Sequence, residues 1–204
     1  MTDYIRRLEV GEMKANCYLI LNKTKEKCLI IDPGDDADYI ERVIADLDVV
    51  PVALIATHGH FDHIMAATEL KLAYRIPFIM NPKDSFLLTR MASSAKHFQG
   101  VSTLPAPDID IPLKAGKIEI EDWMIEVISV PGHTPGSVAL YFSDLQSVFV
   151  GDLIFADNYV GRTDFAYSDK DTLKDSIESL KALPPMTQMY PGHGSEFLFD
   201  DLKS

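Results

Sequence analysis

The stretch that decides the fold runs Thr57-His58-Gly59-His60-Phe61-Asp62-His63, with three imidazoles and one carboxylate among its residues. Residues 52–56 before it form a short continuous apolar run, which is typical of a buried strand. Residues 64–74 after it repeat apolar positions at helical spacing. The cluster is therefore expected where a strand ends and a helix begins.

The spacing inside this cluster suits two cations. His58 and His60 lie two positions apart, so in an extended chain both side chains leave the backbone on the same side and can meet one cation. Asp62 and His63 follow as the chain turns into the helix, which re-aims their side chains and leaves them free to hold a second cation close by. We interpret the stretch as half of a two-metal site.

Composition limits the classes of protein that need to be considered. The chain has 204 residues, 47% of them hydrophobic, which suits one substantial core, so a single domain is expected over residues 1–204. The net charge of -12, without a basic stripe, argues against a nucleic-acid surface. The first residues contain no continuous apolar segment, so we expect no signal peptide, no membrane span and a cytoplasmic location.

Apolar periodicity divides the chain into strands and helices. We predict strands over 4–10, 16–21, 28–31, 52–56, 76–80, 117–120, 123–130, 138–142, 147–150 and 187–190, and helices over 36–47, 64–74, 82–91 and 170–183. Residues 92–112 show no clear period, so we expect a long loop there that forms a functional rim or lid. Cys17 and Cys28 lie inside apolar runs and are expected as core thiols of a reduced protein.

Five of the six histidines fall in turns that directly follow predicted strands, and only His97, expected on the surface or in a loop, lies elsewhere. Such turns are where an open sheet gathers a site from distant parts of the sequence. Asp152 ends a predicted strand as well. The predicted metal ligands are His58, His60 and His133 for one cation and Asp62, His63 and His193 for the other, with Asp152 bridging the two.

Four motifs carry a family resemblance. They are residues 57–63, Pro131-Gly132-His133-Thr134-Pro135-Gly136, Gly151-Asp152 and Pro191-Gly192-His193-Gly194, and together they resemble the metallo-β-lactamase fold superfamily. The resemblance implies an α/β fold of the αββα type, a four-layer sandwich with two central sheets face to face, helices outside and metals at one edge. Within that superfamily, Asn16-Cys17-Tyr18 and residues 151–155 and 161–165 look most like glyoxalase II (hydroxyacylglutathione hydrolase) and its short relatives.

Some features depart from the neighbouring families. Full-length glyoxalase II carries a further C-terminal helical segment that helps bind glutathione, whereas this sequence ends soon after His193. Residues 161–165 also resemble persulfide dioxygenases, which use a single iron and do not use the later histidine as a ligand. True β-lactamases lack a bridging aspartate at the position of Asp152, and flavodiiron proteins usually have a carboxylate where His60 stands.

The expected chemistry follows from the ligand types. Two dications, two carboxylates and one hydroxide leave a small positive charge that suits an incoming carbonyl oxygen. We therefore predict a dinuclear metal-dependent hydrolase in which a metal-bridging hydroxide, oriented by the catalytic Asp62, attacks a thioester or a related ester. Zinc is the first choice of metal, with iron and manganese open. The alternatives are a mononuclear iron persulfide dioxygenase and a lactone hydrolase of the same fold.

The expected partner is a small-molecule substrate, with no nucleic acid and no membrane, and a homo-oligomer is left open. Arg162 is a candidate for binding a substrate carboxylate, although an ion pair with Asp164 is at least as good an interpretation. Asn158 and Tyr159 are candidate pocket residues in the loop after Asp152. The basic residues Lys83, Arg90 and Lys96 are candidate anion contacts, with ordinary solvated charges as the favoured interpretation.

Overall fold

A computed structural model of the chain describes residues 4–199 and contains two six-stranded sheets. The first sheet has its strands in sequence order: β1 (Ile5–Val10), β2 (Ala15–Leu21), β3 (Lys27–Ile31), β4 (Val50–Ile55), β5 (Phe78–Met80) and β6 (Ile111–Pro112). The β1, β2 and β3 strands pair antiparallel, and the later neighbours from β3 onward pair parallel. Parallel pairing requires crossovers, which the helices between these strands provide.

The second sheet is mostly antiparallel. Its order is β12 (Phe197–Leu198), β11 (Gln188–Pro191), β10 (Ser147–Gly151), β9 (Val138–Phe142), β8 (Trp123–Ser129) and β7 (Gly116–Ile120). Its one parallel pair is β10 with β11. Because β8 and β10 both run antiparallel to β9, the strands β8, β10 and β11 all point the same way and end at the same edge.

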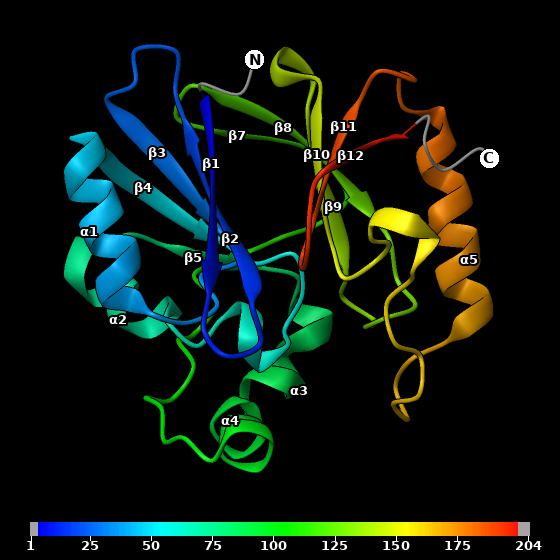
Figure 1. Cartoon of the computed structure of the whole chain (residues 1–204), viewed down its shortest axis with the longest axis horizontal. Helices are drawn as coiled ribbons and strands as arrows, with labels where there is room; N and C mark the ends of the chain where they lie inside the picture. Colours follow the sequence, from blue (N-terminus) through cyan, green and yellow to red (C-terminus); the bar gives the residue numbers. More distant parts are fainter. Residues whose placement is uncertain (1–3, 200–204) are drawn as a thin grey trace.

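Helices cover the outer faces of both sheets (Figure 1). The helices α1 (Ala37–Leu47) and α2 (Ala67–Tyr74) lie on the first sheet, α5 (Lys170–Ser179) lies on the second, and α3 (Ser85–Leu88) and α4 (Met91–Gln99) lie at the lower edge of Figure 1. Short 3-10 turns occupy Phe61–His63, Pro82–Asp84, Ser143–Leu145, Ala156–Asn158 and Leu180–Ala182. These layers confirm the αββα sandwich that the motifs imply.

Three apolar cores separate the four layers, and strand alternation explains them. All residues of β2 are buried, because this strand has a core on each side. Cys17 and Leu19 point toward the helices, whereas Tyr18 and Ile20 point toward the second sheet. The third core packs α5 against the second sheet through Leu173 and its neighbours. Each such side chain, fully buried, stabilises the fold by roughly 1.5–3 kcal/mol.

The structure corrects the expected loop over 92–112. Its first part is helix α4, which buries Met91 and Ala95 on one face and leaves its other residues half-buried or exposed. Two buried residues in a short amphipathic helix give too weak a period to detect from sequence. The predicted helix over 82–91 is instead a 3-10 turn followed by the separate α3.

Other elements agree closely with the prediction, apart from the two-residue strands β6 and β12, which were missed. The helix expected from residue 64 begins at Ala67, after the 3-10 turn. Cys17 and Cys28 are free and buried, as predicted. Within residues 4–199, no helix is both long and apolar enough to span a membrane.

Asn16 on β2 joins the first sheet to the turn after β11. Its backbone N–H donates to the oxygen of Gly192 at 2.7 Å, and its buried Nδ2 donates to the oxygens of Pro191 at 2.9 Å and Gly194 at 2.8 Å. The hydroxyl of Tyr18 donates to the same Pro191 oxygen at 2.6 Å. The turn that carries His193 is therefore held by the opposite sheet.

Removing these bonds tests how much they stabilise the junction. Asn16→Ala should lower the free energy of unfolding by about 2 kcal/mol, because it loses the two hydrogen bonds that its side chain donates to Pro191 and Gly194. Tyr18→Phe should cost about 1 kcal/mol, since Asn16 still satisfies Pro191. Chemical denaturation of the metal-free protein measures both. An Asn16→Ala loss no larger than that of Tyr18→Phe would contradict this assignment.

Candidate metal centre

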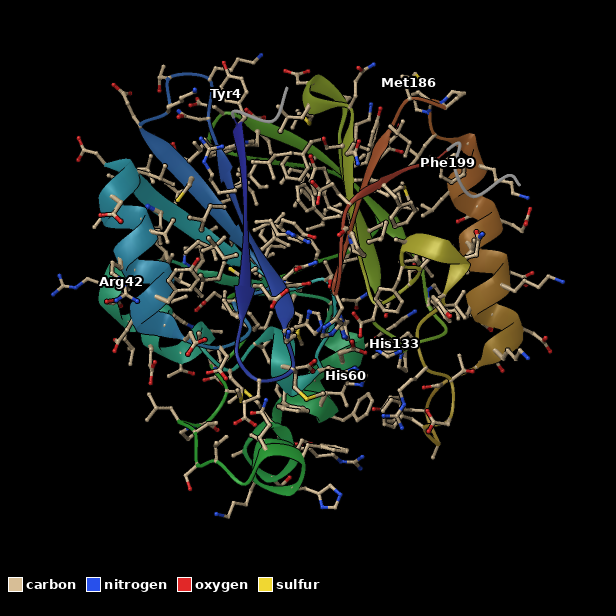
Figure 2. All side chains as sticks on the ribbon, in the orientation of Figure 1. Tyr4, Arg42, His60, His133, Met186 and Phe199 are labelled. Atoms are coloured by element: carbon tan, nitrogen blue, oxygen red, sulfur yellow. The ribbon has the colours of Figure 1, made fainter. Side chains whose placement is uncertain are left out.

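Seven side chains from four turns meet at one edge of the two sheets. His60, from the turn after β4, and His133, from the turn after β8, approach each other between the sheets (Figure 2). Asp152 directly follows β10, and His193 follows β11. The common direction of β8, β10 and β11 explains why three distant turns arrive at one place.

The first donor group contains His58, His60, His133 and Asp152. One donor atom from each lies within 4.8 Å of the others. The Nε2 of His133 is 2.9 Å from the Nδ1 of His60 and 3.6 Å from the Oδ2 of Asp152. The structure thus brings together the residues expected around the first cation, and their role as ligands stays a prediction.

The second donor group contains Asp62, His63 and His193, whose donor atoms also lie within 4.8 Å of one another. The Nε2 of His193 is 3.3 Å from the Oδ2 of Asp62 and 3.3 Å from the Nε2 of His63. The Nδ1 of His193 donates outward to the backbone oxygen of Lys14 at 3.2 Å. Asp62 makes no capping hydrogen bond to the helix that follows, and its carboxylate instead contacts His193.

Asp152 lies between the two groups. Its Oδ1 is 3.4 Å from the Nε2 of His63, and its Oδ2 is 3.6 Å from His133 and 3.7 Å from His193. Gly192 allows this close approach, because a Cβ there would collide with both Asp152 and His63. The carboxylate therefore has the position that a ligand shared by two cations requires.

The imidazoles are oriented by partners on the side that faces away from the cluster. The Nδ1 of His133 donates to the backbone oxygen of Arg162 at 2.8 Å, which leaves its Nε2 pointing inward. His60 is turned the other way: its Nε2 donates to the hydroxyl of Tyr167 at 2.8 Å, so its Nδ1 points inward. An outward N–H fixes the tautomer and leaves a lone pair for a cation.

Asp32, in the turn after β3, orients His58 and His63, and the sequence analysis did not identify this role. Its Oδ2 lies 3.2 Å from the Nδ1 of His63 and accepts the hydroxyl proton of Thr57 at 2.7 Å. Because that hydroxyl has donated its proton, it accepts from the Nδ1 of His58 at 3.1 Å. An Asp directly after an apolar run and directly before Pro-Gly is the sequence signal that could have found it.

The inward atoms repel one another unless positive charge lies between them. His60 and His133 face each other through lone pairs at 2.9 Å. The Nε2 atoms of His63 and His193 lie 3.3 Å apart beside Asp62 and Asp152, which raise the pKa of both rings and so attract positive charge to this point. The Nε2 of His58 is buried and has no hydrogen-bond partner among residues 4–199, which is costly for a polar atom. The donor set therefore fits divalent cations, and the absence of thiolates favours zinc, iron or manganese.

Charge states in the cluster also suit cations. Burial together with the neighbouring His133 lowers the pKa of His60 to about 3, so the ring is neutral. Burial alone would raise the pKa of Asp152, but His63 outweighs it and holds the pKa well below its usual range. Conversely, burial alone would lower the pKa of His63, but Asp152 and Asp62 outweigh it and raise the pKa. The raised pKa favours a protonated His63 in the metal-free protein, and a cation bound at that ring would replace the proton while the carboxylates stay ionised.

The comparisons with known proteins agree with this geometry. A sequence model described as the metallo-beta-lactamase superfamily matches residues 10–193. The chain belongs to the metallo-beta-lactamase superfamily. Among curated members, it is 33% identical to the probable metallo-hydrolase YqgX of Bacillus subtilis, over 94% of this chain and 90% of the relative. It is 34% identical to the hydroxyacylglutathione hydrolase GloC of Haemophilus influenzae, over 94% of this chain and 91% of the relative.

Solved structures of the superfamily match nearly the whole fold. The crystal structure of the BLEG-1 B3 metallo-beta-lactamase superposes with a TM-score of 0.90 and 28% identity, covering 97% of this chain and 95% of that one. The structure of TTHA1623 in a di-iron-bound form gives a TM-score of 0.88 and 31% identity, covering 96% of both chains. The superfamily assignment therefore rests on sequence and on fold.

Beside the cluster of this superfamily member lies a cavity of about 570 Å³. It is lined by Met13, Gly59, His60, Phe61, Asp62, Leu87, Arg90, Ser94, Phe98, His133, Asp152, Phe155, Val160, Arg162, Phe165, Tyr167 and His193. The lining therefore includes candidate ligands from both donor groups. A substrate in this cavity would face both proposed cations.

The candidate substrate-binding residues differ in their position relative to the cavity. Arg162 lines the cavity and also pairs with Asp164. Its Nε donates to the Oδ1 of Asp164 at 2.9 Å, and its Nη2 donates to the Oδ2 at 2.7 Å. Asn158 and Tyr159 are not among the lining residues of this cavity: Asn158 has a left-handed backbone (φ 63°), and Tyr159 is 72% exposed, so their contact with a substrate stays a prediction.

The basic residues and the sixth histidine also differ in whether they line the cavity. Arg90 lines the cavity, whereas Lys83 and Lys96 do not. His97 is exposed, as expected, but it lies on α4 rather than in a loop, and it is not part of the lining. Because α4 was not predicted, the positions of Lys96 and His97 relative to the cavity could not be derived beforehand.

Asp84 is a second residue whose role the sequence analysis missed. It is fully buried in the 3-10 turn after β5 and accepts hydrogen bonds from the N–H of Gly59 at 3.0 Å, the N–H of Gly136 at 2.7 Å and the hydroxyl of Thr134 at 2.7 Å. These donors belong to the two turns that carry His58, His60 and His133. Asp84 therefore clamps one turn from each sheet.

Asp84→Asn should lower the free energy of unfolding of the metal-free protein by about 1–3 kcal/mol, because an amide nitrogen cannot accept these bonds. It should also weaken zinc binding by roughly tenfold or more, since both turns lose their common anchor. Denaturation and competition with a chromophoric chelator measure the two effects. Asp46→Asn, at an exposed position on α1, is the control. Unchanged zinc affinity in Asp84→Asn would show that the clamp does not position the ligands.

Proposed function

We propose that the protein is a dinuclear metal-dependent hydrolase that acts on a thioester or a related ester. The observation that carries this proposal is the position of Asp152, whose carboxylate contacts both donor groups at the wall of the cavity. A shared ligand is what a pair of cations needs and a single cation does not. The substrate class is supported by GloC, a hydroxyacylglutathione hydrolase that is 34% identical to this chain.

In this proposal His58, His60 and His133 hold one cation, Asp62, His63 and His193 hold the other, and Asp152 contacts both. When bound, the two cations would supply a water nucleophile that ionises near neutral pH and would polarise the substrate carbonyl. Zinc is the first choice. Iron is supported by the solved structure of TTHA1623, which is described as di-iron-bound.

Asp62 has a further task in the proposed reaction. Its buried carboxylate lines the cavity, with Oδ2 3.3 Å from His193, so it can accept a hydrogen bond from the attacking water and aim the lone pair of that water at the carbonyl carbon. The new carbon–oxygen bond forms and the carbon–sulfur bond breaks. The water proton leaves to solvent or to the departing sulfur, giving a carboxylic acid and a thiol.

Removing the shared carboxylate tests the core of the proposal. Asp152→Ala should lose most of its bound metal and its hydrolytic activity together, because both donor groups lose a ligand and the remaining imidazoles repel one another. Elemental analysis and a thioester assay on the same preparation measure this. Asp46→Ala, on the exposed face of α1, should change neither. An Asp152→Ala protein that keeps its metal and its turnover would remove Asp152 from the bridging role.

The main alternative, a mononuclear iron persulfide dioxygenase, predicts different measurements. The proximity of His193 to Asp62 and His63 favours the hydrolase, because it completes a second donor group. Purified protein should contain two divalent cations per chain and hydrolyse thioesters such as S-lactoylglutathione without oxygen. One iron per chain, with oxygen uptake in the presence of a persulfide and no thioester cleavage, would overturn the proposal. A panel of lactones assayed beside the thioesters tests the other alternative, a lactone hydrolase of the same fold.

A further inference from the structure

Exposed apolar side chains gather at the mouth of the cavity beside the donor groups. Phe98 on α4 is 54% exposed, Val160 in the loop after β10 is 47% exposed, and Met13 in the turn between β1 and β2 is 43% exposed. All three line the cavity, although they come from three separate parts of the chain. Large apolar side chains left in water and grouped around a hollow mark a binding surface more often than chance exposure.

Aromatic rings continue this surface inward to the candidate metal ligands. Phe98 stacks on Phe61 with ring centroids 5.7 Å apart and an interplanar angle of 3°. Phe61 stands between His60 and Asp62 in the sequence, so the stack begins at the cluster itself. Across the lining, the ring of Phe165 lies 5.2 Å from the ring of His60.

Few charged side chains line this cavity apart from the candidate metal ligands. Arg90 and Arg162 are the two lysine or arginine side chains of the lining, and Asp164 already binds Arg162 through two hydrogen bonds. A cavity of about 570 Å³ is in the size range that accepts a ligand with many more atoms than a two- or three-carbon acyl group. The remaining contact surface is therefore suited to an apolar group.

We propose that the substrate carries an apolar group at least as large as a benzene ring, which lies against Phe61, Phe98 and Met13 while the scissile carbonyl faces the donor groups. This inference rests on the proposed hydrolase function. The apolar group belongs either to the acyl part or to the leaving group, and both give the same contact with the wall. Burying such a group removes the exposed apolar surface of the wall from water, which stabilises the complex.

Two substrate series distinguish the sources of the apolar group. In the first, the thiol is constant and the acyl group runs from acetyl through lactoyl and hexanoyl to phenylacetyl. In the second, the acyl group is acetyl and the thiol runs from mercaptoethanol to benzyl and hexyl thiols, whose alkyl thiolates are similar leaving groups. In at least one series kcat/KM should rise by roughly tenfold or more from the smallest to the largest apolar group. A flat profile in both series would overturn the inference.

Variants of the wall connect the preference to these residues. Phe98→Ala and Met13→Ala should each lower kcat/KM for the largest substrate by about three- to tenfold more than kcat/KM for acetyl mercaptoethanol, because only the large group contacts the wall. Leu72→Ala removes a side chain of α2 that is 68% exposed and outside this cavity, and it should change neither value. Equal losses for small and large substrates would contradict the assignment.

A binding measurement separates this inference from the proposed function. Non-hydrolysable thioethers of the same two series, titrated into the protein by calorimetry, should bind more tightly as the apolar group grows, and Phe98→Ala should abolish that trend. The trend without any thioester hydrolysis would refute the hydrolase and leave the apolar wall supported. Hydrolysis without the trend would do the reverse. If Phe98→Ala instead converts a dimer to a monomer without altering the trend, the wall is a subunit contact and the inference is wrong.

Discussion

The repulsion among inward-facing lone pairs is the constraint on which the site depends. Each of the five imidazoles donates its N–H outward, to Thr57, Tyr167, Asp32, Arg162 or Lys14, so each turns its other nitrogen toward its neighbours. Two ionised carboxylates, Asp62 and Asp152, add negative charge to the same volume. Bound cations would stabilise such an arrangement, and without them the fold holds these groups together against their mutual repulsion.

The fold meets that demand by joining its two sheets at the polar edge. Three apolar cores stabilise the layers elsewhere, while the edge is tied by backbone and side-chain hydrogen bonds between turns. Asn16 fixes the turn of His193 from the first sheet, and Asp84 clamps the turns of His58 and His133. The N–H of Val138 donates to the oxygen of Thr57 and adds a backbone link between the sheets. These links set the distances between donor atoms that come from distant turns.

Sequence reasoning predicts the strands and the seven clustered residues because both have local signals. Apolar runs mark the buried strands, and imidazoles in turns directly after them mark the edge. The residues that orient the cluster lack such a signal: Asp84 and Tyr167 meet their partners only through the packing of segments far apart in the chain. Helix α4 was missed because its apolar face is short, and with it the wall built on Phe98. Tyr159 was expected in the pocket but lies outside the lining and is exposed. The direction of the backbone within a loop cannot be derived from the composition of the loop.

Anomalous diffraction from crystals of the zinc-loaded protein tests the central claim most directly. Two peaks should appear about 3.5–4 Å apart, as in other two-metal sites. One should lie against His58, His60 and His133 and the other against Asp62, His63 and His193, with the carboxylate of Asp152 touching both. A single peak, or a second peak away from His193 with Asp152 turned outward, would contradict the dinuclear centre.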